Sequence, residues 1–227
     1  MTKKNKKIKE VIEEVEVVVE DKFSLIPDTI THVHSQDPVP RDLTFEKPPG
    51  TVLKENGILF MDKKFDQENC MPLVKMIMEY NLMPPSKAPD IIRLYINSPG
   101  GEVASAFHLI DVIKQSRIPV YTYGMGSIAS CGVLLMMAGE SGHRYLTQNT
   151  SIMSHQYSWG SGGKEHELFA KIKQFEISSE KLMDHYKKCT GKSRKYIRKH
   201  LLPESDMWLT PEEAVTHGIA DKVVETY

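Results

Sequence analysis

The sequence has few cysteines and almost no net charge. Its 227 residues include 3 cysteines, Cys70, Cys131 and Cys189, and the formal net charge is -1 at pH 7. An odd number of cysteines without Cys-x-x-Cys spacing supports neither a disulfide framework nor a zinc site. We therefore expect free thiols, no metal and no other cofactor. A nearly neutral chain also lacks the excess positive charge that binds nucleic acid.

Long apolar runs are missing as well. The most apolar stretch, residues 133–138, is too short to cross a bilayer. The basic residues at the N-terminus are not followed by the apolar core of a signal peptide. From these features we expect no membrane association and a cytoplasmic location.

The first fifty residues differ in composition from the rest. Charge clusters alternate with valines up to residue 21, and five prolines lie between residues 25 and 50. Such a composition resists regular structure, so residues 1–50 are expected to form an arm or a removable leader. His32 and His34 lack suitable partner ligands nearby and are expected to be solvated loop residues rather than a metal pair.

From residue 51 onward, short apolar segments alternate with helical patterns. Strands are expected over 57–61, 91–96, 120–123 and 220–224, and helices over 66–80, 103–115 and 133–139. Alternation of this kind predicts an α/β domain over residues 51–227, with a parallel sheet flanked by helices.

Ser130 is the most informative residue of the sequence. It lies in Gly-Met-Gly-Ser-Ile-Ala-Ser-Cys-Gly, where small residues permit a sharp turn into the apolar helix that follows. A hydroxyl at a helix N-terminus faces free amides that favour developing negative charge. Ser130 is therefore a candidate nucleophile, with the neighbouring Cys131 as a weaker alternative.

A nucleophilic serine needs a base and an orienting acid. His155, at the end of the apolar segment 151–154, is the candidate base, and Asp206, just before a helix start at Thr210-Pro211, is the candidate acid. Glu204 is a nearby alternative carboxylate. Five other histidines lie in polar stretches and are expected at the surface, namely His143, His166, His185, His200 and His217.

Backbone donors for an oxyanion are indicated by the segment Tyr-Ile-Asn-Ser-Pro-Gly-Gly over residues 95–101. An apolar strand ends there in two glycines, which allow close backbone approach. The amides of Gly101 and Cys131 could together bind the negative oxygen of a tetrahedral intermediate.

A long helix is expected over 164–188, after the glycine-rich residues 158–163. Its apolar residues recur three, four or seven positions apart and form one stripe. Periodicity alone does not separate an ordinary surface helix on the domain's own core from a helix that contacts another subunit.

Four segments together resemble the Clp protease proteolytic subunit (ClpP) family of serine peptidases. They are residues 95–101, 126–132, 153–156 and 206–214, and they occur in the family's order. The resemblance implies a ClpP/crotonase-like fold with a protruding strand-helix handle at about 157–190. It also implies Ser130, His155 and Asp206 as the catalytic triad, with Gly101 and Cys131 as the oxyanion amides.

The resemblance further implies how such a chain works. Peptides and unfolded proteins would be cleaved inside a homo-oligomer of heptameric rings, with two stacked rings forming a tetradecamer, fed by an AAA+ unfoldase. The sequence lacks Gly-x-x-x-x-Gly-Lys-Ser/Thr, so ATP would bind the partner.

Some features depart from the family pattern. About two extra residues precede Asp206, Tyr157 stands where proline is usual, and residues 1–50 match poorly. Two other functions therefore stay open at this point: a non-catalytic structural ring subunit, and a crotonase-like acyl-CoA enzyme.

Overall fold

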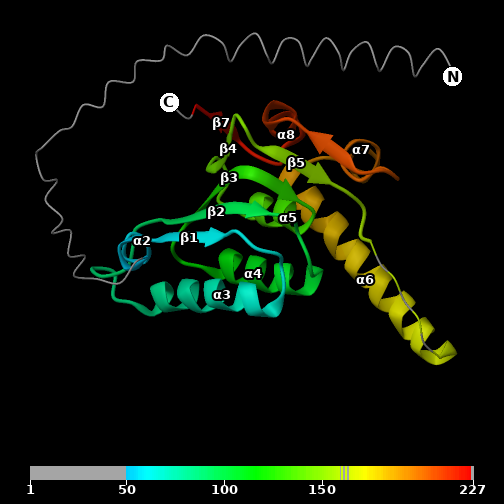
Figure 1. The fold of residues 1–227 in the computed structure, drawn as a ribbon, viewed down its shortest axis with the longest axis horizontal. Coiled ribbons are helices and arrows are strands. Elements are labelled where there is room, and N and C mark those ends of the chain that lie inside the picture. Colours follow the sequence, from blue (N-terminus) through cyan, green and yellow to red (C-terminus); the bar gives the residue numbers. More distant parts are fainter. Residues whose placement is uncertain (1–49, 159, 161, 163, 226–227) are drawn as a thin grey trace, which may run out of the picture. The chain divides into compact units, whose positions relative to one another are not determined.

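Short apolar segments form a seven-stranded sheet in the computed structural model, which describes residues 50–158, 160, 162 and 164–225. The strands β1 (Ile58–Met61), β2 (Ile92–Ser98), β3 (Val120–Ala129), β4 (Arg144–Thr147) and β7 (Lys222–Val224) lie side by side in that order. From β3 the sheet also branches to β5 (Ser151–Ser154), which pairs with β6 (Met207–Leu209). Figure 1 shows this sheet with helices around it.

The sheet is parallel except at one pair of strands. All pairings from β1 to β7 and from β3 to β5 are parallel, as the sequence predicts, whereas β5 and β6 are antiparallel. Alternate side chains of β2, including Ile92, Leu94 and Ile96, are fully buried. Burial of apolar surface is the main force that holds the sheet to its helices.

Two helices lie along one side of the sheet and pack against each other, α3 (Gln67–Leu82) and α4 (Val103–Gln115) (Figure 1). The helix α3 begins at Asp66, whose Oδ1 accepts a hydrogen bond from the Asn69 amide at 2.9 Å, as expected from the sequence. The short helix α5 (Cys131–Met137) has every residue buried. It starts two residues earlier than expected, directly after Ser130.

The helix α6 (Glu165–Thr190) projects away from the sheet (Figure 1). Its buried residues, Leu182, Met183, His185 and Tyr186, all lie near its C-terminal end. Towards the other end Phe169, Ile172 and Ile177 are exposed. The apolar stripe therefore packs on the domain's own core only near the base of α6, and the outer part has the form of the expected handle.

The C-terminal segment contains elements that the sequence predicts and others that it does not. The helix α8 (Pro211–His217) begins with the expected capping box, in which the Glu213 amide donates to Thr210 Oγ1 at 3.2 Å. The helix α7 (Arg194–His200) and the strand β6 of this segment were not expected from the sequence. Two elements elsewhere in the chain, β4 and the short helix α2 (Thr51–Glu55), were not expected either. These four elements are three to seven residues long, too short to show a hydrophobic period.

The described residues belong to one compact unit, Lys47–Tyr227. The proposed arm falls almost entirely on residues 1–49, which lie outside the described residues together with His32 and His34. Across the described part of the chain, no helix has both the length and the apolar character needed to span a membrane.

Candidate active site

Ser130 occupies a strained turn between β3 and α5. Its φ of 55° and ψ of -117° make it the one residue other than glycine with positive φ among those described. Such a conformation costs about 1–3 kcal/mol and persists only where surrounding contacts enforce it. Here the Ser130 amide donates to the Met153 carbonyl at 2.9 Å, which ties the turn to β5. This turn places the Ser130 hydroxyl at the start of the buried helix α5.

The Gly100-Gly101 turn lies directly against this serine. A Cβ atom at Gly100, whose φ is +95°, would stand 2.5 Å from Ser130 Cβ and 3.1 Å from its Oγ. At Gly101, with φ +147°, a Cβ would overlap the carbonyl of Phe65. Both positions therefore require glycine, for close approach as well as for conformation.

The hydrogen bonds around Gly101 set the direction of its amide. The Phe65 amide donates to the Gly100 carbonyl at 2.8 Å, and the Glu102 amide donates to the Phe65 carbonyl at 2.7 Å. These bonds use the carbonyl of Gly100 and the amide of Glu102, the two residues that flank Gly101. In a parallel pairing of this kind the N–H and C=O of the residue between them, Gly101, point away from Phe65. Its carbonyl accepts from Cys131 Sγ at 3.2 Å, so its amide also faces the serine turn.

The second candidate donor is the amide of Cys131. Cys131 is the first residue of α5, and the first amides of a helix have no partner within the helix. Two amides from different elements thus lie beside Ser130, which is the arrangement that stabilises an oxyanion.

The pairing of β5 with β6 brings together the segments that carry His155 and Asp206. Ile152 pairs with Leu209, Met153 with Trp208 and Ser154 with Met207. Continued by one step beyond the strands, this antiparallel register would set His155 opposite Asp206, and directly opposite residues of paired strands have Cβ atoms about 4.5–5.5 Å apart. The chain between Gly191 and Asp206 forms α7 and the turn after it.

The alternative acid, Glu204, faces a different cavity. It lines a hollow with Tyr157, Arg194 and Arg198, between the base of α6 and α7. The register of β6 therefore favours Asp206 over Glu204 as the partner of His155.

Four of the five proposed site residues line one small cavity of about 50 Å³, namely Gly101, Ser130, Cys131 and His155. Its remaining wall combines apolar residues such as Val103, Leu134 and Leu182 with polar ones such as Gln156 and Ser158. Asp206 is exposed and does not line it. Within the described residues no hydrogen bond joins Ser130 to His155 or His155 to Asp206. Catalytic hydrogen bonds are commonly long without substrate and tighten when it binds.

Burial makes Cys131 a poor nucleophile. Its side chain is buried, and desolvation raises the pKa of the thiol to about 11 in spite of its hydrogen bond to Gly101. The reactive thiolate is therefore scarce at neutral pH. This favours Ser130 over the cysteine alternative.

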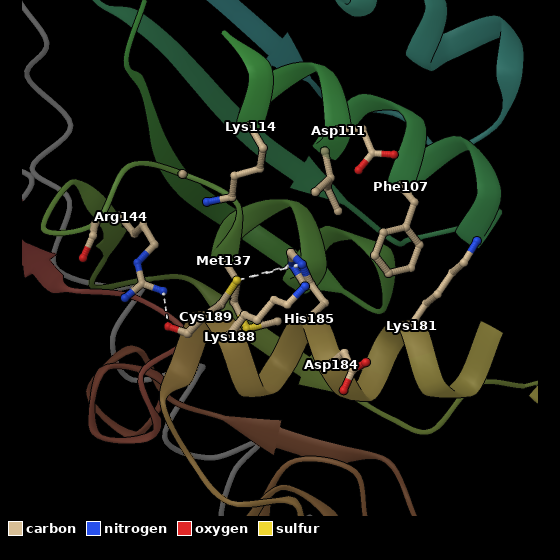
Figure 2. Close-up of a pocket in the computed structure, with 13 residues that line it drawn as sticks. Phe107, Asp111, Lys114, Met137, Arg144, Lys181, Asp184, His185, Lys188 and Cys189 are labelled. Carbon is tan, nitrogen blue, oxygen red and sulfur yellow. Dashed lines mark hydrogen bonds between the residues drawn. The ribbon is translucent and has the colours of Figure 1, made fainter. Parts of the chain in front are cut away.

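A second and larger cavity, of about 540 Å³, lies between α4 and the base of α6 (Figure 2). It contains none of the proposed site residues, but it corrects one expectation. His185 was expected at the surface and is instead buried, with its Nε2 2.8 Å from the Leu134 carbonyl and Cys189 beside it. Desolvation lowers the pKa of His185, so the neutral ring with a proton on Nε2 donates to Leu134. This bond fixes α6 to the helix that follows Ser130.

Comparison with known proteins decides the family. The Clp protease family model matches residues 47–227. ATP-dependent Clp protease proteolytic subunit 1 of Corynebacterium jeikeium is 32% identical over 190 residues, which is 84% of this chain and 96% of that protein. The chain belongs to the Clp protease family.

Other members of the Clp protease family are similarly close. Proteolytic subunit 2 of Corynebacterium diphtheriae is 33% identical over 175 residues, covering 77% of this chain and 85% of the relative. That of Corynebacterium glutamicum is 32% identical over 172 residues, covering 76% and 83%. These findings confirm the resemblance, the fold class and the activity predicted from the sequence. The chain is a serine-type endopeptidase of the ClpP kind.

Proposed function

We propose that Ser130, His155 and Asp206 form the catalytic triad of this peptidase, with the amides of Gly101 and Cys131 as the oxyanion hole. The observation that carries the proposal is the strained turn at Ser130, which lines one cavity with His155, Gly101 and Cys131. Strain of this kind is found mainly at functional sites. The β5–β6 register supports Asp206 as the third member.

In this mechanism Ser130 Oγ attacks the carbonyl carbon of the scissile peptide bond. His155 takes the hydroxyl proton and returns it to the leaving amine, while Asp206 orients the imidazole and stabilises its protonated form. The two amides bind the negative oxygen, and each such donor contributes roughly 3 kcal/mol of transition-state stabilisation. Water then hydrolyses the acyl-enzyme by the same route.

The setting of this chemistry is also part of the proposal. The relatives are named as subunits of an ATP-dependent protease, and this chain carries no P-loop sequence for ATP. We propose heptameric homo-oligomeric rings, stacked in pairs as a tetradecamer, that receive unfolded proteins from an AAA+ unfoldase in the cytoplasm. Residues 1–50 would form the arm and residues 51–227 the peptidase domain.

The direct test is Ser130→Ala, assayed with a short fluorogenic peptide that needs no unfoldase. We expect kcat to fall roughly a million-fold, because the nucleophile is lost. Ser127→Ala is the matched control, since Ser127 is an exposed serine three residues earlier on the same segment and should keep its activity. Full hydrolysis by Ser130→Ala would overturn the proposal.

The two other functions that the sequence left open are separated by simple binding measurements. A fluorophosphonate probe should label Ser130 in the parent chain, whereas a non-catalytic ring subunit would not react. A crotonase-like enzyme would bind acyl-CoA in calorimetry. Family membership favours the peptidase, and we expect labelling without acyl-CoA binding.

A further inference from the structure

His155 lies between two side chains that hold its segment to the chain leading to Asp206. On one side of it, Ser154 Oγ is 2.5 Å from the carbonyl oxygen of Leu201. On the other side, Gln156 Nε2 donates to the carbonyl of Leu202 at 3.1 Å. Two consecutive carbonyls, four and five residues before Asp206, are therefore bonded to the two neighbours of His155.

Tyr186 of α6 completes this arrangement from within the core. Its hydroxyl is 2.7 Å from Ser154 Oγ, and both side chains are buried. A carbonyl oxygen can only accept, so the single proton of the Ser154 hydroxyl goes to Leu201. The Tyr186 hydroxyl must then donate to Ser154. The bonds run in one direction, from α6 through β5 to the Leu201 carbonyl.

Tyr186 belongs to the hydrophobic core, and Ser154 beside it is fully buried. Buried hydrogen bonds require fixed geometry, because an unsatisfied polar group in the core is costly. Desolvation raises the pKa of Tyr186 far above its ordinary value, which keeps the hydroxyl protonated as a donor. Tyr186 also lines the cavity that contains Ser130 and His155.

The residue before Tyr186 makes the matching contact to the serine side of the site. His185 bonds to the Leu134 carbonyl in α5, the helix that starts after Ser130, and Figure 2 shows it where α6 passes beneath that helix. Two successive residues of α6 thus hold the helix of the nucleophile and the strand of the base. The position of α6 therefore affects how Ser130 and His155 face each other.

We infer that Tyr186 is a positioning residue for peptide hydrolysis, which acts through Ser154 to hold His155 opposite Asp206. The inference rests on the proposed triad. It assigns Tyr186 no contact with the reacting atoms, so its removal should affect the rate of the chemical step and leave peptide binding unchanged.

The test is Tyr186→Phe, which keeps the ring and removes the hydroxyl. We expect kcat for a short peptide to fall about tenfold, because small displacements of a catalytic group have large effects on rate, with little change in KM. Labelling by a fluorophosphonate should slow in proportion. Sedimentation of each variant verifies that the assembly is unchanged.

Tyr80→Phe is the matched control. Tyr80 is also buried, and its hydroxyl also donates a hydrogen bond, in this case to the backbone carbonyl of Lys54 in α2, but it does not line the cavity at the site. It should lower stability by a similar amount and leave kcat unchanged. A purely structural role for Tyr186 would make the two variants behave alike, which would overturn the inference.

Ser154→Ala and the double variant provide an independent test. If Tyr186 acts only through Ser154, adding Tyr186→Phe to Ser154→Ala should lower kcat no further. Additive losses would contradict the inference, and so would a normal kcat in Ser154→Ala, a result that needs no folded Tyr186→Phe. Failure of the triad would appear separately, as activity retained in Ser130→Ala.

Discussion

The serine side of the proposed site and its aspartate side differ in how firmly the fold holds them. Ser130 bonds through its amide to β5, precedes a fully buried helix and contacts a glycine turn that leaves no space for a side chain. Asp206 is exposed, and it precedes a strand of three residues that pairs with β5. The proposed nucleophile is positioned by the core, whereas the proposed acid depends on one short strand pairing and on the hydrogen bonds of Ser154 and Gln156 to the chain before it.

The largest expected effect that sharpens this comparison comes from Asp206→Asn. The amide keeps the shape but cannot stabilise a protonated imidazole or impose the same tautomer, so kcat should fall by up to roughly 10⁴-fold. Stability should change little because the side chain is exposed. Peptide kinetics together with urea unfolding measure both quantities.

Glu204→Gln is the control for this variant. It removes the same charge two residues earlier, from a side chain that faces the cavity with Arg194 and Arg198. We expect kcat to stay near that of the parent. If Glu204→Gln lost the activity and Asp206→Asn retained it, the acid would be misassigned and the register argument would be wrong.

The next largest effect is expected from Gly100→Ala, which tests the serine side of the site. The new methyl group would meet Ser130 Cβ and strain a residue at φ +95°. We expect kcat to fall about a hundredfold, because a displacement of about 1 Å at a nucleophile has that effect. The measurement is the rate of fluorophosphonate labelling alongside peptide hydrolysis.

Gly142→Ala separates the effect of backbone strain at a glycine from the effect of contact with Ser130. Gly142 has a φ of +84°, and a Cβ there would meet nothing within 4 Å. It should therefore lose about 1 kcal/mol of stability and keep its activity. Equal losses of activity in both variants would show that backbone strain alone, and not contact with Ser130, explains the effect of Gly100→Ala.

The difference between the firmly packed serine side and the aspartate side also explains which elements the sequence could predict. Strands and helices on the serine side carry long apolar patterns, glycines at close contacts and recognisable caps such as Asp66, so β1, β2, α3 and α4 were predicted almost to the residue. The strand β3 was predicted only in its first part, since Gly124 and Gly126 interrupt its pattern. Ser130, His155 and Asp206 were predicted as site residues from their motifs.

What the sequence could not predict depends on contacts between distant segments. The strand β6 is three residues long and exists through pairing with β5, which no local pattern reveals. His185 lies among lysines in the sequence, and only the packing of α6 on α5 buries it. The bond between Tyr186 and Ser154 likewise joins residues 32 positions apart. The sequence predicted only that Tyr186 lies in the long helix expected over 164–188.

The smallest expected effect concerns the helix after Asp206, tested by Thr210→Ala. Loss of the capping hydroxyl should lower the free energy of unfolding by about 1 kcal/mol. Activity should stay nearly normal, because the buried Leu209 still pairs with Ile152 and keeps the register that sets Asp206 opposite His155. Urea unfolding and peptide kinetics on the same preparation measure the two effects.

Ser193→Ala removes an equivalent cap from α7, where Ser193 Oγ accepts from the Tyr196 amide at 3.2 Å, and so provides a matched loss of stability. If Thr210→Ala lowered kcat about tenfold while Ser193→Ala did not, the helix α8 rather than the β5–β6 pairing would position the acid. Asp206 would then be held in place mainly by the helix that follows it. Ser154, Gln156 and Tyr186 would contribute less to the position of Asp206, because they contact or support only the chain that precedes it.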